Sequence, residues 1–335
     1  MGKDRIKWVD YAKAISIILV VFHHSVFKEL DSVFYHDALN TFDNMLNRVR
    51  MPLFFFIAGL FIHKALTSHI SYFLKSKIYH FSYLFVLWAM ISFLFKDLAP
   101  YIVKGVYDGP KDIMSFLVVD PPVWFIYALL IFFAVTRLAR SYLPVVLCIT
   151  VILYTLSAQS DEYIFLDKLV RFYPFFLMGY MINDVVKKLA TRVNYHLLLF
   201  MPLYFWAVIT LSEWSNTPLG IFILSLGGIA SGIIIAVLLT HSSAFSWLGY
   251  VGKNTLPIYV AHTIPVGVLR EILPYVIPGQ VALATIILVV SGVGLPLLAS
   301  IISKKIGMGW LFDTSFLKKD NIQKQASGLE KTTIQ

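Results

Sequence analysis

The sequence predicts an all-α fold, a polytopic membrane helix bundle with about ten transmembrane helices. Of the 335 residues, 58% are hydrophobic and only 14% are charged, which is too apolar for a soluble globular domain. Apolar runs of about twenty residues recur, each long enough to cross roughly 30 Å of hydrocarbon as a helix. They lack the alternation of barrel strands, so their backbones must be satisfied within helices. The predicted spans are residues 8–27, 44–63, 76–96, 123–139, 142–158, 167–187, 196–213, 218–240, 252–272 and 280–303.

The positive charges predict how these spans are oriented. With the N-terminus in the cytoplasm, ten spans return the C-terminus to the same side, and about two-thirds of the 28 Lys and Arg residues fall in cytoplasmic segments. This bias accounts for the net charge of +9 without a nucleic-acid partner. The first run contains Asp10 and Lys13 and lacks a small-residue cleavage site, so we expect it to be a retained span. We expect a multi-pass protein of the cell inner (cytoplasmic) membrane with both termini cytoplasmic.

The chain is expected to form one transmembrane domain, residues 1–312, followed by a disordered cytoplasmic tail, residues 313–335, which is polar and lysine-rich. The longest outer connections, Lys28–Asn44 and Asp97–Pro122, are natural places to hold a polar acceptor outside the lipid. The single cysteine, Cys148, excludes an intrachain disulfide and a thiol metal cluster, and we expect a buried structural thiol.

The first span carries ionisable residues at membrane depth, where such groups are costly and mark a protein-lined cavity with a function. Lys13 and His24 are eleven positions apart, about three helical turns, so they share one face, and Asp10 lies near it. An imidazole is the usual general base for a hydroxyl, so we favour a catalytic role for His24 over a packing role. His23 points about 100° away and is interpreted as a packing or tuning neighbour.

The cations near the predicted cytoplasmic boundary allow two interpretations, a structural role or the binding of an anionic group. Lys13 either pairs with Asp10 or draws an anionic group into the bundle. Lys75 and Lys77 either follow the topology rule alone or bind the phosphates of a nucleotide-containing acyl donor.

Three further residues are supporting candidates. Trp124 opens the fourth span, where tryptophan is normally an interfacial anchor. Arg171 lies near an outer boundary, where it can also simply reach the interface. His262 is a second membrane histidine, in the ninth span. No metal site is predicted.

Together these features resemble the acyltransferase family 3 integral membrane proteins, which include O-acetyltransferases of bacterial surface polysaccharides. The resemblance covers residues 8–303, with Lys13 standing where arginine is commoner, Ala58 where serine is usual and His80 where a further arginine often stands. It rests on five elements: Asp10, Lys13 and His24 in the first span, MPLFFFIAGLF (Met51–Phe61), VWFIYALL (Val123–Leu130), FYPFFLMGYMI (Phe172–Ile182) and GKNTLPIYVAH (Gly252–His262).

The resemblance implies an acyltransferase that moves an acyl group, expected to be acetyl, from acyl-CoA to a hydroxyl of a cell-surface or exported glycan. His24 would be the base, and Lys75 and Lys77 would hold the CoA phosphates. Acyl-CoA (acetyl-CoA) is then a donor substrate and no cofactor is permanently bound. The alternative is a proton-linked transporter or exporter of an anionic solute using His24 and His262, although the sequence shows no broken-helix pair. The sequence identifies no protein partner.

Overall fold

The computed structural model describes residues 6–28, 32–95, 102, 123–157, 165–211, 214 and 216–314, and the regular elements within these residues are helices. In chain order they are α1 (Lys7–Ser25), α2 (Asp37–Gly59), α3 (His63–Thr67), α4 (Ile70–Phe73), the π-helix η1 (Leu74–Tyr79), α5 (His80–Phe93), α7 (Trp124–Leu138), α8 (Leu143–Leu156), α9 (Phe165–Met181), α10 (Asn183–Ala190), η4 (Tyr195–Leu199), α11 (Phe200–Thr210), α13 (Pro218–Leu239), η5 (Ser243–Phe245), α14 (Ser246–Lys253), α15 (Thr255–Ala261), α16 (Thr263–Val276), α17 (Val281–Lys305) and η6 (Gly309–Leu311). The predicted helical bundle is confirmed.

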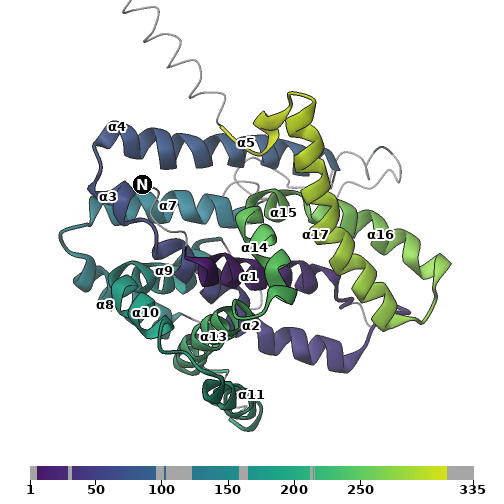
Figure 1. Ribbon diagram of the computed structural model, residues 1–335, viewed down its shortest axis with the longest axis horizontal. Helices are drawn as coiled ribbons and strands as arrows, with labels where there is room; N and C mark the ends of the chain where they lie inside the picture. The colour runs from purple at the N-terminus through teal and green to yellow at the C-terminus, as the bar shows by residue number, and fades with distance from the viewer. Residues whose placement is uncertain are drawn as a thin grey trace, which may run out of the picture.

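Helix α1 lies at the centre of the bundle (Figure 1). It packs against α2, α13, α14, α15, α16 and α17. Small residues let these neighbours approach closely, and Ala12, Ala14 and Ser16 are all fully buried. The ionisable residues of the first span are therefore carried into the protein interior by a helix that other helices surround.

Glycines set the closest helix crossings. A Cβ on Gly59 of α2 would lie 2.0 Å from the carbonyl oxygen of Phe176, and a Cβ on Gly179 of α9 would lie 2.1 Å from that of Phe56. The two helices therefore meet backbone to backbone, each through its own glycine.

The spacing of Gly228 and Gly232, which indicates helix packing in the sequence, has the same role on α13. A Cβ on Gly228 would lie 2.7 Å from the carbonyl oxygen of Arg48, and one on Gly232 would lie 2.4 Å from a methyl carbon of Leu53. Both contacts are with α2, which confirms the packing interpretation.

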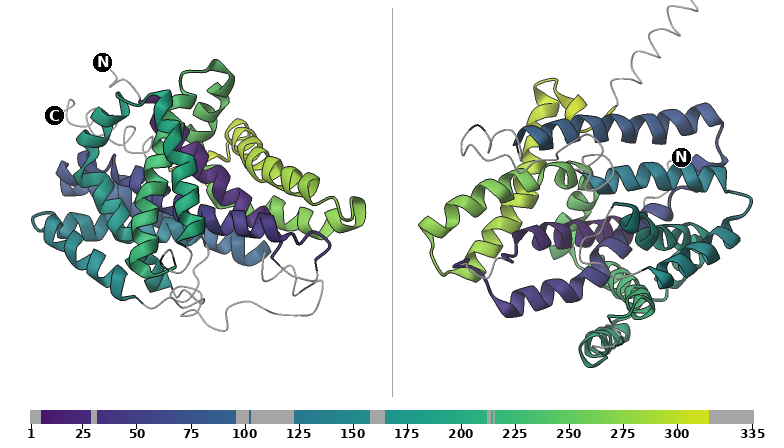
Figure 2. Two further views of the ribbon diagram at one scale, coloured as in Figure 1. Left: turned by 90° about the horizontal axis from the view of Figure 1, so that it is seen from below. Right: turned by 180° about the vertical axis from the view of Figure 1, so that it is seen from behind.

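Polar contacts also join segments outside this centre to one another. The guanidinium of Arg137, on α7, donates to the carbonyls of Ala65, Leu66 and Ser68 at the end of α3. Near the end of the described chain, Leu311 accepts a hydrogen bond of 2.7 Å from the indole of Trp88 on α5 (yellow beside α5 in Figure 1). Figure 2 shows α16 and α17 as a hairpin beside this core.

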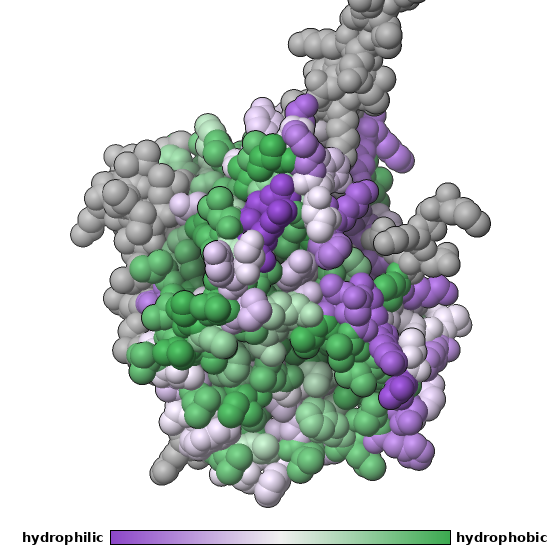
Figure 3. All heavy atoms as spheres, turned by 90° about the vertical axis from the view of Figure 1, so that its left-hand side faces the viewer, coloured by the Kyte–Doolittle hydropathy of each residue, from purple (hydrophilic) through white to green (hydrophobic). Residues whose placement is uncertain are grey.

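The surface is that of a membrane protein. Apolar side chains face outward on α8, where Val145, Ile149 and Ile152 are exposed. The face in Figure 3 is largely hydrophobic, with hydrophilic residues gathered along one edge. By length and composition, three helices of the described chain can cross a membrane, or up to five if each of two bent helix pairs counts as one span. The expectation of about ten crossings stays a prediction.

Three sequence expectations are corrected by the packing. Helix α2 begins at Asp37, so the second half of the predicted outer connection Lys28–Asn44 is helical. The predicted continuous span 252–272 is broken, and α15 and α16 meet at 50°. Cys148 is exposed, because α8 buries only one side against its neighbours. The predicted acceptor segment Asp97–Pro122, residue 102 excepted, and the tail 315–335 lie outside the described residues.

Candidate functional site

Two clusters of polar side chains lie along the central helix. We call one the histidine end: His23, His24, Asp43, His262 and Arg270. We call the other the lysine end: Lys13 and Lys187, which both lie near Phe61, and Lys77, which lies near Lys13. Both are built from segments far apart in sequence, so neither could be assembled from spacing alone.

The ring of His24 lies between two other imidazoles. Its centroid is 5.1 Å from that of His23 and 5.1 Å from that of His262. His24 is an exposed residue in the last turn of α1, whereas His262 is only 3% exposed. The structure therefore brings the two histidines of the sequence prediction together and leaves the His24 ring accessible.

Arg270 fixes the end of α1. Its Nη1 donates to the carbonyl oxygen of His24 at 3.1 Å, and its guanidinium lies 4.4 Å from the ring centroid of Phe27. A cation beside the carbonyls that end a helix is favourable because it opposes the negative end of the helix dipole. Arg270 thus holds the backbone of His24 against α16.

The break between α15 and α16 positions His262. Its Nδ1 lies 2.7 Å from the carbonyl oxygen of Tyr259. A carbonyl only accepts hydrogen bonds, so Nδ1 carries the proton and Nε2 keeps the lone pair in the neutral ring. The same segment supports its neighbours, since the backbone N–H of Phe125 donates to the hydroxyl of Tyr259 at 2.9 Å.

His23 has a carboxylate partner that the sequence does not predict. Its Nδ1 lies 2.7 Å from Oδ2 of Asp43, a side chain that is only 1% exposed. Arg50 donates to Oδ1 of the same carboxylate at 2.7 Å, and Lys28 lies 3.8 Å from Oδ2. The spacing of Asp43 and Arg50, two helical turns apart, would indicate a pair on one helix face. However, Asp43 falls in a predicted polar loop and Arg50 in the predicted span that follows it.

Trp124 belongs to an aromatic wall beside this end. Tyr259 connects this wall to His262. Its ring centroid lies 6.2 Å from that of His262 and 5.2 Å from that of Phe125, at the start of α7. Trp124 itself contacts Phe172, with ring centroids 5.7 Å apart. Arg171 is half-buried next to Phe172 on α9. Trp124 therefore lies in this wall, and Arg171 directly precedes one of its members in the chain.

At the lysine end three helical segments bring cations together. Nζ of Lys13 lies 5.6 Å from the ring centroid of Phe61, and Nζ of Lys187 lies 5.9 Å from the same ring. Lys77 lies close enough to Lys13 for the two positive charges to repel each other. Lys187 is not among the predicted site residues, because nothing in the sequence predicts that α10 brings this side chain near Phe61.

Lys75 and Lys77 lie on the six-residue π-helix Leu74–Tyr79. The π-helical turn is rare and occurs frequently at functional sites. Lys77 reaches inward, with Nζ 4.6 Å from the ring centroid of Phe133, whereas Lys75 is exposed. Of the two predicted phosphate ligands, the structure places only Lys77 in the cluster.

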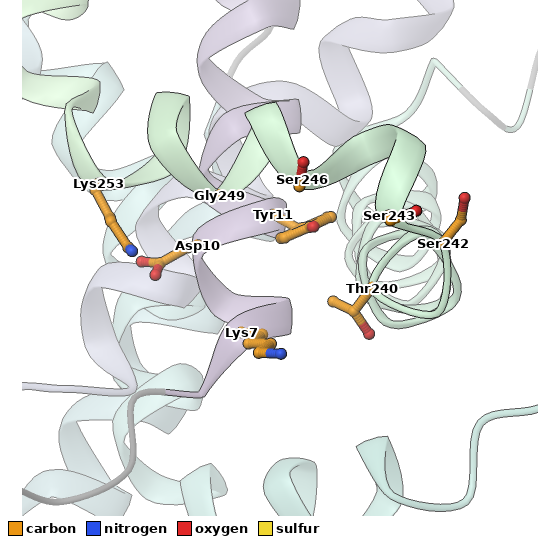
Figure 4. A pocket seen from close by; sticks show the side chains of 9 residues that line it. All are labelled: Lys7, Asp10, Tyr11, Thr240, Ser242, Ser243, Ser246, Gly249 and Lys253. Carbon is orange, nitrogen blue, oxygen red and sulfur yellow. The ribbon is translucent and has the colours of Figure 1, made fainter.

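Asp10 is 4% exposed and lines a separate pocket of about 530 Å³ (Figure 4). In the figure its carboxylate and the amine of Lys253 point toward one another. A Cβ on Gly252 would lie 1.7 Å from the carbonyl oxygen of Asp10, so α14 must approach α1 through glycine. The pocket is lined by Lys7, Asp10, Tyr11, Thr240, Ser242, Ser243, Ser246, Gly249 and Lys253.

Asp10, Lys13 and His24, which the sequence predicts to lie on or near one face of a helix, therefore lie in three different environments along α1. Asp10 lines the pocket, Lys13 belongs to the lysine end and His24 belongs to the histidine end. In the part of the chain that the structure describes, no group of three or more His, Cys, Asp and Glu side chains is placed to hold a metal ion. What the arrangement offers is an accessible imidazole at one end and a group of cations toward the other.

Comparison with known proteins adds two findings. The sequence model of the Acyl_transf_3 family, an acyltransferase domain, matches residues 6–303. The chain is also similar to a protein of Escherichia coli (strain K12) named inner membrane protein YcfT, at 23% identity over 298 residues, which is 78% of this chain and 80% of that protein. No solved structure matches significantly.

Proposed function

Because the chain belongs to the Acyl_transf_3 family of membrane acyltransferases, we propose that it moves an acetyl group from acetyl-CoA to a hydroxyl of a cell-surface or exported glycan. The observation that best supports this proposal is the accessible ring of His24, held between His23 and His262 at the end of the central helix. An imidazole is suited to take a hydroxyl proton near neutral pH.

In the proposed reaction the glycan hydroxyl attacks the thioester carbonyl of acetyl-CoA while His24 takes its proton. A carbon–oxygen bond forms, the carbon–sulfur bond breaks, and the leaving thiolate receives the proton from the imidazolium. The products are the glycan ester and CoA thiol. General base catalysis of this kind contributes about 10²–10⁴ in rate.

The donor would enter from the lysine end. Lys13, Lys77 and Lys187 would offer their ammonium groups to the CoA phosphates. Lys13 and His24 are separated by eleven residues, about 16 Å along the helix axis, which suits an extended acyl-CoA arm between phosphates and thioester. Lys75 would contribute from the exposed side of the π-helix, as a more distant charge.

The proposed location is the inner membrane, in keeping with the name of the E. coli relative. The lysine end faces the cytoplasm, where acyl-CoA is available, and both termini are cytoplasmic. The histidine end faces the opposite side, where the glycan acceptor approaches. Asp10, with Lys253 beside it, would stabilise the contact between α1 and α14 rather than touch either substrate.

Replacing Lys187 by Met should raise the apparent KM for acetyl-CoA several-fold, because one ammonium group leaves the lysine end. Its pairing with Asp184 at 3.6 Å is with a highly exposed carboxylate, so little stability is lost. The measurement is initial rate against acetyl-CoA concentration in proteoliposomes. Lys188→Met, an exposed neighbour on the same helix, is the matched control and should leave KM unchanged. Equal KM values for both variants and wild type would contradict the donor assignment.

A second candidate is the proton-linked transporter or exporter of an anionic solute. The break between α15 and α16 favours it, because transporters bind substrates at interrupted helices and His262 lies at this one. Acetyl-CoA-dependent labelling of glycan by purified protein in proteoliposomes separates the two functions. Solute movement without thioester consumption would favour transport.

Mass spectrometry of surface glycans from cells with and without the protein would identify the acyl group and the acceptor together. We expect an acetyl ester on a sugar hydroxyl that disappears with the protein. Identical glycan acylation in both strains would contradict the proposed reaction.

A further inference from the structure

Asp43 is the buried carboxylate of the histidine end. Its side chain is 1% exposed, and its two oxygens have different partners. Oδ1 accepts from Nη1 of Arg50 at 2.7 Å, within the same helix, and Oδ2 lies 2.7 Å from Nδ1 of His23 on α1. Arg50 also donates to the backbone carbonyl of Asp43 at 3.2 Å. A buried carboxylate needs such partners, because desolvation of an unpaired charge is very costly.

These two contacts make Asp43 a bridge between helices. Arg50 fixes the orientation of the carboxylate on α2, and the other oxygen then fixes the ring of His23 on α1. Because a carboxylate only accepts, it holds the proton of the neutral ring on Nδ1. Because both oxygens of the buried carboxylate have partners, the carboxylate itself is held in place. The ring of His23, which is bonded to one of these oxygens, therefore has little freedom to rotate.

The fixed ring of His23 is in turn packed on His24, with centroids 5.1 Å apart and the planes at 66°. His262, whose own ring is anchored by backbone carbonyls, closes the other side at 5.1 Å. Among the described residues, the charged and titratable groups that contact His24 include His23, His262 and Arg270. Those that lie behind His23 include Asp43, Lys28 and Arg50.

We propose that Asp43 and His23 are positioning residues for the acyl transfer: the carboxylate, oriented by Arg50, locks the ring of His23, and that ring holds His24 in its reactive orientation. The inference rests on the proposed function of His24 and adds the residues that act through it. Small misplacements of a reacting group can reduce a rate by about 10² even when the change is remote from the chemistry.

The test is Asp43→Asn. The new side chain keeps its shape and can still accept from Arg50, but its amide now offers a donor to Nδ1 of His23 and favours the opposite tautomer. We expect kcat for acetyl transfer to fall about 10- to 100-fold. The KM for acetyl-CoA should stay within a factor of about two, since the donor cations belong to the lysine end. Asp37→Asn, the same change at an exposed site on the same helix, should leave both constants unchanged.

A second variant guards against loss of folding. His23→Asn leaves Asp43 and Arg50 paired and places an amide donor near the former Nδ1, so the buried carboxylate keeps a partner. His23→Asn should also lower kcat at normal membrane abundance. Asp43→Glu keeps a carboxylate at this position, so its kcat should be higher than that of Asp43→Asn. Wild-type kcat in both Asp43→Asn and His23→Asn would overturn the inference.

A spectroscopic readout keeps the test independent of the proposed reaction. In lipid-reconstituted protein labelled with ¹⁵N-histidine, His23 should carry its proton on Nδ1. Asp43→Asn should move that proton to Nε2 and also change the ring resonances of His24. An unchanged His24 spectrum overturns the inference. An unchanged rate in His24→Ala would instead defeat the proposed function, whatever Asp43 shows.

Discussion

Replacing His24 by alanine is expected to reduce acetyl transfer by about 10²–10⁴-fold, because no other group in the proposed mechanism takes the hydroxyl proton. The side chain is exposed, so its removal opens no large cavity and membrane abundance should match that of wild type. The measurement is acetyl-CoA-dependent glycan labelling in proteoliposomes containing equal amounts of each protein.

The matched control is His36→Ala. His36 is an exposed histidine just before α2, and its side chain makes no capping hydrogen bond to that helix. Its replacement should leave the rate unchanged. Full activity in His24→Ala at normal abundance would remove the residue from the chemistry and leave the neighbouring histidines as the bases to examine.

Gly179→Ala should destabilise the protein strongly, because the added methyl group would meet the backbone of a crossing helix. The new carbon would lie 2.1 Å from the carbonyl oxygen and 2.9 Å from the carbonyl carbon of Phe56. Overpacking typically costs about 1–3 kcal/mol, and a backbone obstacle on α2 cannot rotate away as a side chain can, so the two helices must separate. We expect a lower thermal midpoint in detergent and reduced membrane abundance.

Gly294→Ala provides the matched control for that experiment. Gly294 also lies within a helix, α17, but a Cβ there would meet no atom within 4 Å. Alanine is intrinsically the better helix former by about 1 kcal/mol, so this variant should be as stable as wild type or more so. Similar thermal midpoints for the two variants would contradict the close crossing of α2 and α9.

The helices themselves were largely predictable from the sequence, because a run of about twenty apolar residues is a local property. Segment ends were less so. Residues 37–43, which end in Asp43, have the composition of a polar loop, yet they form the first turns of α2, in which Arg50 pairs with Asp43. A polar pattern is misread when its charges neutralise one another inside the protein.

The same limit applies to the site. His24 and Lys13 could be identified because ionisable residues at membrane depth are costly and stand out in an apolar run. Lys187 could not, since lysines near a membrane boundary are common and only the packing of α10 places this one near Phe61. His23 looks like a simple neighbour of His24 until its carboxylate partner on another helix is known.

By itself, the sequence determined that this protein is a helical membrane bundle of the acyltransferase kind, with a histidine and a lysine on its first helix. Hydropathy and short motifs carry that information because they are read within one segment. Only the tertiary structure decided which side chains meet: His24 on α1 with His262 at the break between α15 and α16, and His23 on α1 with Asp43 on α2. Such contacts depend on how close two helices can approach, which small residues and buried charge pairs set jointly.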